Sequence, residues 1–280
     1  MKLSAFKNNK NRLRNIWWVA IFFVVLAGFT FPLILLSQYY KFEITILYQA
    51  IIVVLASVIC QLWRGEPLSD MFGTFNFRWL TTLGAGLLTG AALMLTASFF
   101  LWIAGSVTWQ NNKIELLPLL SVSTSFAAVA VAEEVLFRGF IFQRLMASIG
   151  TWPAQIIIAA YFLLIHMNNP GMTGTVKVLA SINIFLASIM FGLAYIRTKS
   201  LAMPIGIHFT ANLVQGVVLG FGVSGNEQAS LLTPVFQSSR EWLTGGSFGL
   251  EASVPGLICV IVIVVMLFKW KPAIETGRTI

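Results

Sequence analysis

The chain has 280 residues, of which 58% are hydrophobic and only 10% are charged. Soluble domains carry about 25% charged residues, so this composition excludes an ordinary soluble domain and predicts a protein whose surface faces lipid. The net charge of +8 would suggest a nucleic-acid-binding protein only if the basic residues formed one patch or stripe.

Apolar runs recur along the whole chain. The first follows a basic N-terminal segment, and at about 20 residues it exceeds the 7–15 residues of a signal-peptide core, so we expect a retained span. Eight runs are long enough, or nearly so, to cross the hydrocarbon core as helices. They cover residues 17–36, 44–62, 79–103, 117–142, 153–167, 178–196, 201–222 and 254–268. We therefore predict an all-α, polytopic membrane helix bundle of about eight transmembrane helices, forming one membrane domain over residues 1–280.

The basic residues predict the orientation of this bundle. With eight spans both termini lie on one side, and that side receives 14 of the 18 lysines and arginines: Lys2, Lys7, Lys10, Arg12, Arg14, Arg64, Arg78, Arg138, Arg144, Arg197, Lys199, Lys269, Lys271 and Arg278. The other side receives Lys41, Lys113, Lys177 and Arg240. Cytoplasmic loops carry the excess of positive charge. We therefore expect a multi-pass integral membrane protein with both termini in the cytoplasm, in a prokaryotic plasma membrane, and no nucleic-acid partner.

The one long connection on the outer side covers residues 223–252 and is rich in Gly, Ser and Gln. We expect it to be a simple connection without a part in a functional site. The alternative is that it covers such a site.

Ionisable groups inside apolar spans are costly, which makes them candidates for function. Here they are few, and both histidines of the chain are among them. The candidates are Glu133, Glu134, Arg138, His166 and His208, together with Asn212, which follows His208 by four residues.

Their spacing predicts how these groups meet. Residues four apart share a helix face, so Glu134 can pair with Arg138. Glu133 lies about 100° around the same helix and faces elsewhere. A helical hairpin is expected at Gly150, which lies 17 residues after Glu133 and 16 before His166. Antiparallel packing would bring Glu133 and His166 to one level.

The candidates suit the attack of water on an acyl carbon. Taken singly, a buried Glu–Arg pair, a membrane histidine and an asparagine are each explained by helix packing. Brought together, they favour a site in which Glu133 is the general base and His166 shares the water. His208 and Asn212, four residues apart, would donate hydrogen bonds to the developing oxyanion.

At these residues the sequence resembles the CAAX-processing and bacteriocin-processing intramembrane proteases, the group that includes the Ras-converting prenyl proteases. The family pattern is EExxxR, then FxxxH, then HxxxN. The chain has EEVLFR at 133–138, FLLIH at 162–166 and HFTAN at 208–212, in that order, within a motif-bearing core of about residues 117–222.

The resemblance implies an intramembrane endopeptidase in which Glu133 and His166 activate water while His208 and Asn212 support the oxyanion. Glu134 and Arg138 are assigned to orientation. Such enzymes have been called metalloproteases, and Glu133, His166 and His208 would be the ligands of a zinc ion. The chain lacks the HExxH pattern of many zinc peptidases, so we favour metal-free catalysis and keep zinc as the alternative.

The expected substrate is a peptide or protein at the membrane or near a C-terminus, with or without a lipid attached. Two other classes remain open. A non-catalytic immunity or scaffold protein would keep the fold without turnover. A proton-coupled transporter would also bury Glu, Arg and His, but it predicts an inverted repeat, and the sequence shows none.

Overall fold

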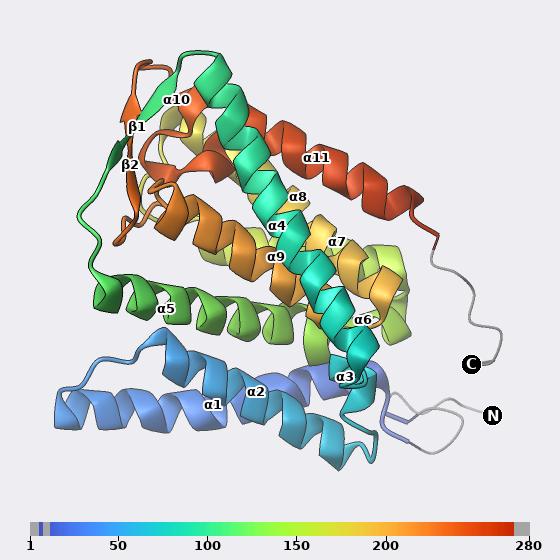
Figure 1. Cartoon of the computed structure of the whole chain (residues 1–280). Coiled ribbons are helices and arrows are strands. Elements are labelled where there is room, and N and C mark those ends of the chain that lie inside the picture. Colours follow the sequence, from blue (N-terminus) through green and yellow to red (C-terminus); the bar gives the residue numbers. More distant parts are fainter. Residues whose placement is uncertain (1–5, 8–11, 272–280) are drawn as a thin grey trace.

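The computed structural model describes residues 6–7 and 12–271. Within these residues the structure is a helix bundle with one small two-stranded sheet (Figure 1). Its elements in chain order are α1 (Asn15–Tyr40), α2 (Ile46–Trp63), α3 (Ser69–Phe72), α4 (Phe77–Ile103), β1 (Val107–Asn111), α5 (Leu116–Glu134), η1 (Val135–Phe140), α6 (Ile141–Ile149), α7 (Thr151–His166), α8 (Gly174–Thr198), α9 (Ala202–Asn212), η2 (Leu213–Val218), β2 (Leu232–Phe236), α10 (Glu241–Thr244), η3 (Gly246–Phe248), η4 (Leu250–Ala252) and α11 (Val254–Lys269). The predicted all-α membrane bundle is confirmed.

Five helical segments of the described chain are long and apolar enough to cross a membrane. They are Asn15–Tyr40, Ile46–Trp63, Ser69–Ile103, Leu116–Ile149 and Gly174–Thr198. Three further helical segments are also apolar but shorter: Thr151–His166, Ala202–Val218 and Val254–Lys269. Each of these eight segments overlaps one of the eight apolar runs of the sequence.

The fourth segment is longer than the 117–142 that hydropathy predicts. α5 continues through the π-helical turn η1 into α6 and ends only at Ile149. Inside η1 the backbone of Gly139 leaves the helical region, with ψ at −119°, and the helix changes direction there. Gly150 has a positive φ of 89°, and α7 begins at the next residue. The hairpin expected at Gly150 is therefore present.

The sheet is a feature that the prediction did not contain. β1 pairs antiparallel with β2, with Val107 opposite Phe236 and Asn111 opposite Leu232. Both strands lie in connections that were predicted to be loops, and both contain the β-branched and aromatic residues that favour extended chain. The sheet ties the segment before α5 to the long segment before α11.

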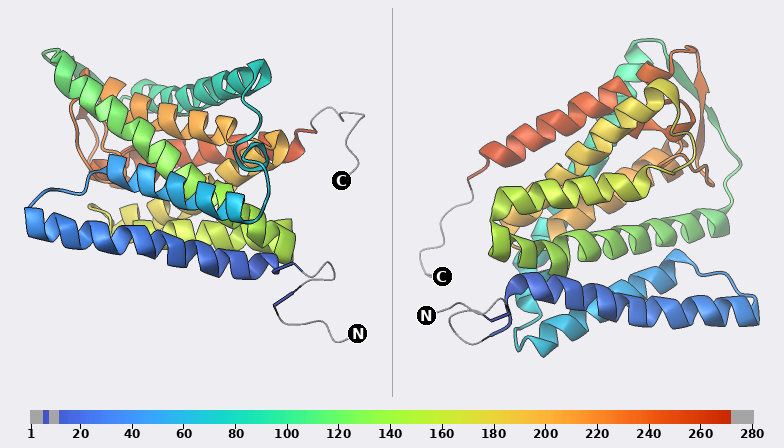
Figure 2. Two further views of the ribbon diagram at one scale, coloured as in Figure 1. Left: turned by 90° about the horizontal axis from the view of Figure 1, so that it is seen from below. Right: turned by 180° about the vertical axis from the view of Figure 1, so that it is seen from behind.

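The helices are arranged in two groups on either side of α5. α1 and α2 pack against the long composite helix of α5, η1 and α6, whereas α4, α8, α9 and α11 pack together beyond it, as the right view of Figure 2 shows. The closest packing joins α4 to α9, where a Cβ on Gly86 or Gly90 would collide with the carbonyl oxygen of Met203 or Ile207. Small residues let membrane helices approach in this way. This close packing holds α9, which carries His208, at the centre of the bundle.

The two ends of the bundle are distinguished by contacts between distant connections. At one end the Ser200 hydroxyl donates to the Phe72 carbonyl at 3.2 Å, and Arg197 Nε donates to the Leu267 carbonyl at 2.9 Å. At the other end β1 pairs with β2, and the start of α5 lies near this sheet (Figure 1). Successive helical segments run between these ends in alternation (Figure 1).

The prediction places one basic residue wrongly. Arg138, assigned to the basic end, is fully buried within the bundle and is not a loop charge. Lys2, Lys10 and Arg278, also counted there, lie outside the described residues. The excess of basic residues at that end remains large without them.

Candidate active site

Glu134 and Arg138 form a buried ion pair at the junction between α5 and η1. Arg138 Nη1 donates to Glu134 Oε1 at 3.1 Å, and neither side chain is exposed. Arg138 Nη2 also donates to the carbonyl and the hydroxyl oxygen of Ser188 on α8, at 3.1 and 2.7 Å. The predicted pair is present, and it fixes α8 to the end of α5.

Three aromatic rings surround the guanidinium of Arg138. Its central carbon lies 4.9 Å from the ring centroid of Phe162, 5.0 Å from that of Phe191 and 5.6 Å from that of Phe137. Aromatic faces attract a cation, and the attraction grows where water is excluded. The rings also hold water away from the ion pair, so the position of Glu134 is fixed from both sides.

His208 is bound to the same carboxylate. Its Nδ1 lies 2.9 Å from Glu134 Oε1, and since an ionised carboxylate only accepts, Nδ1–H is the donor. The imidazole stacks on Phe191, with centroids 5.0 Å apart and an interplanar angle of 13°. The other nitrogen, Nε2, lies 3.9 Å from Glu133 Oε2. Glu134 therefore orients the ring so that Nε2 faces the neighbouring glutamate.

His166, the last residue of α7, approaches Glu133 from the opposite side. Its Nδ1–H donates to the Phe162 carbonyl at 2.7 Å, because a carbonyl can only accept. Its Nε2 lies 4.0 Å from Glu133 Oε1. The hairpin thus brings Glu133 and His166 to one level, as predicted from their distances to Gly150.

Glu133 is the partly exposed member of the group. Its side chain is 21% exposed, whereas that of Glu134 is fully buried. Its oxygens lie too far from the two Nε2 atoms for direct hydrogen bonds, and the separation suits an intervening water. The two adjacent glutamates are therefore separated as the helix geometry predicts, with one bound to Arg138 and the other facing open space.

That space is a cavity of about 370 Å³ between α5, α7, α8 and α9. Glu133, His166, His208 and Asn212 all line it. Its remaining wall is largely apolar, with side chains from α4, α8 and α11. All four predicted reacting groups are therefore brought to one cavity, while Glu134 and Arg138 lie behind it.

Asn212 ends α9 directly before the π-helical turn η2, just as Glu134 ends α5 before η1. Such turns are frequent at functional sites.

The segment 223–252 is not the simple connection that we expected, because it covers this cavity. Glu251 of η4 reaches back, and its carboxylate accepts from the backbone N–H and the hydroxyl of Ser224, each at 3.1 Å, and from Gln215 Nε2 at 3.0 Å. Both Ser224 and Glu251 line the cavity. Burial raises the pKa of the Glu251 carboxyl, while the hydrogen bond from Gln215 and the nearby His166 oppose that rise.

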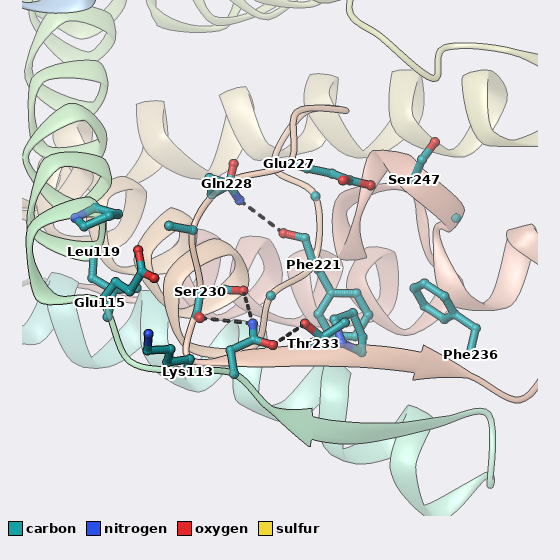
Figure 3. A pocket seen from close by; sticks show the side chains of 17 residues that line it. Lys113, Glu115, Leu119, Phe221, Glu227, Gln228, Ser230, Thr233, Phe236 and Ser247 are labelled. Atoms are coloured by element: carbon teal, nitrogen blue, oxygen red, sulfur yellow. Dashed lines mark hydrogen bonds between the residues drawn. The ribbon is translucent and has the colours of Figure 1, made fainter.

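A second hollow of about 480 Å³ lies outside this cover (Figure 3). It is bounded by the start of α5, the sheet and the segment after η2, with Lys113, Glu115 and Glu227 at its wall. Gln228 lines both this hollow and the cavity at Glu133. The two spaces therefore share a wall, formed by the segment that follows η2.

The zinc alternative can be tested on the positions of its three proposed ligands. The Nε2 atoms of His166 and His208 face the carboxylate of Glu133, but they lie 4.0 and 3.9 Å from its nearest oxygens. Tetrahedral zinc with bonds of 2.0–2.2 Å would hold its ligand atoms about 3.3 Å apart. Across the described residues no group of three His, Cys, Asp or Glu is arranged to hold a metal ion. As placed, the three side chains do not fit a zinc ion.

Several polar residues at the site were not predicted, among them Asn183, Ser188 and Glu251. Asn183 had a detectable signal, because it is an amide inside the apolar run 178–196. Ser188 and Glu251 had none. A serine inside a membrane helix is common, and Glu251 lies in a polar connection.

The fold and the site together define a class: a polytopic helical membrane protein with a buried Glu–Arg pair that orients one histidine, and with a glutamate between two imidazoles. Residues 115–214 match the family model described as Rce1-like, type II CAAX prenyl endopeptidase. The matched segment contains all three motifs, and the match confirms the resemblance predicted from them. The matched family is one of membrane proteases. No match to the chain was found among curated proteins.

Proposed function

We propose that the chain is an intramembrane endopeptidase that hydrolyses a peptide bond of a membrane-associated peptide with water held by Glu133 and His166. The observation that carries this proposal is the position of Glu133, partly exposed in a cavity with an imidazole Nε2 on either side at 3.9–4.0 Å. A carboxylate with this access can take a proton from water while the other groups bind the charge that develops.

The proposed reaction begins with a water between Glu133 and His166. Because His166 donates from Nδ1 to the Phe162 carbonyl, its Nε2 is free to accept from that water. Glu133 takes a proton as the water oxygen bonds to the carbonyl carbon. When the carbon–nitrogen bond breaks, the proton held by Glu133 passes to the leaving amine.

The developing oxyanion needs donors, and the cavity supplies two side chains for this role. Asn212 carries an amide N–H₂ at the wall. His208 donates from Nδ1 to Glu134, so it donates from Nε2 only as an imidazolium. In that form Arg138 and His208 balance the charges of Glu133 and Glu134. Removing one such donor typically costs about 10²–10³ in rate.

The substrate we propose is a peptide or protein segment at the membrane. The matched family is described as a type II CAAX prenyl endopeptidase, and a CAAX-type peptide is therefore the first substrate to consider. The test is a comparison of the peptides released by membranes that contain the wild-type chain or its Glu133→Gln variant. We expect peptides that appear only with the wild type. Identical peptide sets would favour the non-catalytic immunity or scaffold role.

We further propose that catalysis needs no metal ion. Purified enzyme treated with a strong chelator should retain its activity, because water is activated by Glu133 and His166 alone. Elemental analysis should find zinc well below one equivalent, and His208→Gln should lower activity without abolishing it, since an amide still donates. Stoichiometric zinc that is lost in His166 or His208 variants, with activity restored by zinc to the stripped wild type, would reverse this assignment.

We propose eight membrane crossings with both termini in the cytoplasm. The alternating course of the eight helical segments and the basic residues at one end support this topology. Reporter fusions after Arg197 and Lys271 should report the cytoplasm, and fusions at Lys113 and Arg240 the outside. A cytoplasmic signal from the Arg240 fusion would contradict the eight-span topology, because it would place the cover of the site on the inner face.

A further inference from the structure

Asn183, a residue of the cavity wall, carries an unused hydrogen-bond acceptor. It lies on α8, is only 4% exposed, and lines the cavity together with Glu133, His166 and His208. Its Oδ1 is buried and has no hydrogen-bond partner among residues 6–7 and 12–271. A buried amide oxygen without a partner carries a free-energy cost, which a ligand with an N–H can remove.

The orientation of this amide is fixed by its other end. Asn183 Nδ2 donates to the backbone carbonyl of Glu251. A flipped amide would place two oxygens against each other, so the partner determines which atom is Oδ1. Because Glu251 is itself held by Ser224 and Gln215, the cover of the cavity holds Asn183 in place.

The surroundings of Asn183 define what can bind it. The cavity wall beside it is apolar, with Ile184, Ala187 and Met190 from the same helix. The cavity is lined by the carboxyl groups of Glu133 and Glu251 and by the imidazoles of His166 and His208, but by no lysine or arginine of the described chain. A carboxylate would find no lysine or arginine partner there, whereas a neutral peptide segment offers backbone N–H groups and apolar side chains.

We propose that Asn183 is a substrate-binding residue whose Oδ1 accepts a hydrogen bond from one backbone N–H of a neutral, apolar peptide segment next to the scissile bond. This inference rests on the proposed function. Asn183 lies outside the three sequence motifs, so it adds a contact that they do not describe. Its role is to fix the register of the peptide relative to Glu133.

The probe for this contact is a synthetic peptide that spans the most abundant cleavage site from the comparison of wild-type and Glu133→Gln membranes. In a series of analogues, each backbone amide near that site except the scissile one is replaced in turn by an ester, which removes one N–H with little change in shape. For the wild type, one replacement should lower kcat/KM by about fivefold to tenfold, the usual value of one hydrogen bond.

The decisive comparison uses Asn183→Leu, which lacks the acceptor. Its kcat/KM for the all-amide peptide should be lower, and the penalty at that one ester position should disappear while penalties elsewhere persist. Asn183→Ala also removes the acceptor, without adding an apolar branch, and should lose the same penalty. Gln155→Leu is the matched control, because Gln155 is a buried amide that binds the Ile189 carbonyl. It should leave every penalty unchanged.

The outcomes separate this inference from the proposed function. If wild-type membranes release no specific peptides, the proposed function fails, and this contact fails with it. If the enzyme cleaves the peptide but the ester penalties of Asn183→Leu equal those of the wild type, the inference alone is overturned and Asn183 has only a packing role. If Asn183→Leu does not fold, the absence of any penalized ester position in the wild type still overturns the contact.

Discussion

Replacing Glu133 by glutamine is expected to abolish cleavage while the amount of folded protein stays close to that of the wild type. The amide has the shape of the carboxylate but cannot take a proton from water. Its neighbours His166 and His208 lie 4.0 and 3.9 Å away, so the fold does not depend on a direct hydrogen bond to this side chain. General-base catalysis contributes about 10²–10⁴ to a rate, and a loss of at least this size is expected.

The measurement is the turnover of purified protein on a cleavable peptide, with size-exclusion profiles and thermal unfolding as the check on folding. Glu43→Gln is the matched control, because Glu43 is exposed in the connection between α1 and α2. Glu134→Gln gives a useful contrast, since it weakens bonds to both Arg138 and His208 and should reduce folded yield as well as turnover. Turnover by Glu133→Gln within a few-fold of the wild type would eliminate Glu133 as the base.

Local rules were sufficient to predict how the motif residues meet. The pairing of Glu134 with Arg138 follows from a spacing of four on one helix, and the approach of His166 to Glu133 follows from their nearly equal sequence distances to Gly150. These relations depend only on helix geometry and one hairpin. They could therefore be read from the sequence without knowing how the helices rotate against each other.

The parts that could not be predicted depend on long-range packing. Ser188 binds Arg138 because of the way α8 is rotated about its axis. The sequence pattern does not determine that rotation, since α8 is hydrophobic on most sides. The interaction of His208 with Glu134 similarly depends on the close contact between α4 and α9. Sequence spacing predicted only that His208 and Asn212 share a face.

The cover formed by 223–252 was misjudged because its composition is that of a solvated loop. The segment is held in place by close contacts between its glycines and the backbone of neighbouring segments. A Cβ on Gly249 would collide with the Gly222 carbonyl, and one on Gly225 with the Pro170 carbonyl. The first contact joins the end of the segment to the residue just before it, and the second holds the segment against the connection between α7 and α8. Glycines in a polar stretch do not by themselves distinguish such a packed cover from a free loop.

Replacing Arg138 by alanine is expected to have the largest effect on stability. The guanidinium is fully buried, pairs with Glu134, binds Ser188 twice and fills the space between three aromatic rings. Alanine removes all of this and leaves the carboxylate of Glu134 buried, with His208 as its remaining partner. Breaking a buried ion pair by removing one partner costs about 3–5 kcal/mol. The thermal midpoint and the folded yield in detergent should both fall strongly, whereas Arg240→Ala, which changes an exposed arginine of the segment 223–252, should alter neither.

A double replacement separates the charge from the packing. In Glu134→Gln/Arg138→Met no charge is left without a partner, and the methionine refills part of the space between the rings. Replacing a buried pair with neutral side chains of similar size is often tolerated. The pair here is also incompletely satisfied, because Glu134 Oε2 and Arg138 Nε have no hydrogen-bond partner within the described residues. The double variant should therefore regain much of the stability lost in Arg138→Ala. Its turnover should stay low, since a glutamine at 134 no longer holds His208 as a carboxylate does. If the double variant is as unstable as Arg138→Ala, the aromatic contacts of the guanidinium, and not the ion pair, hold this part of the bundle together.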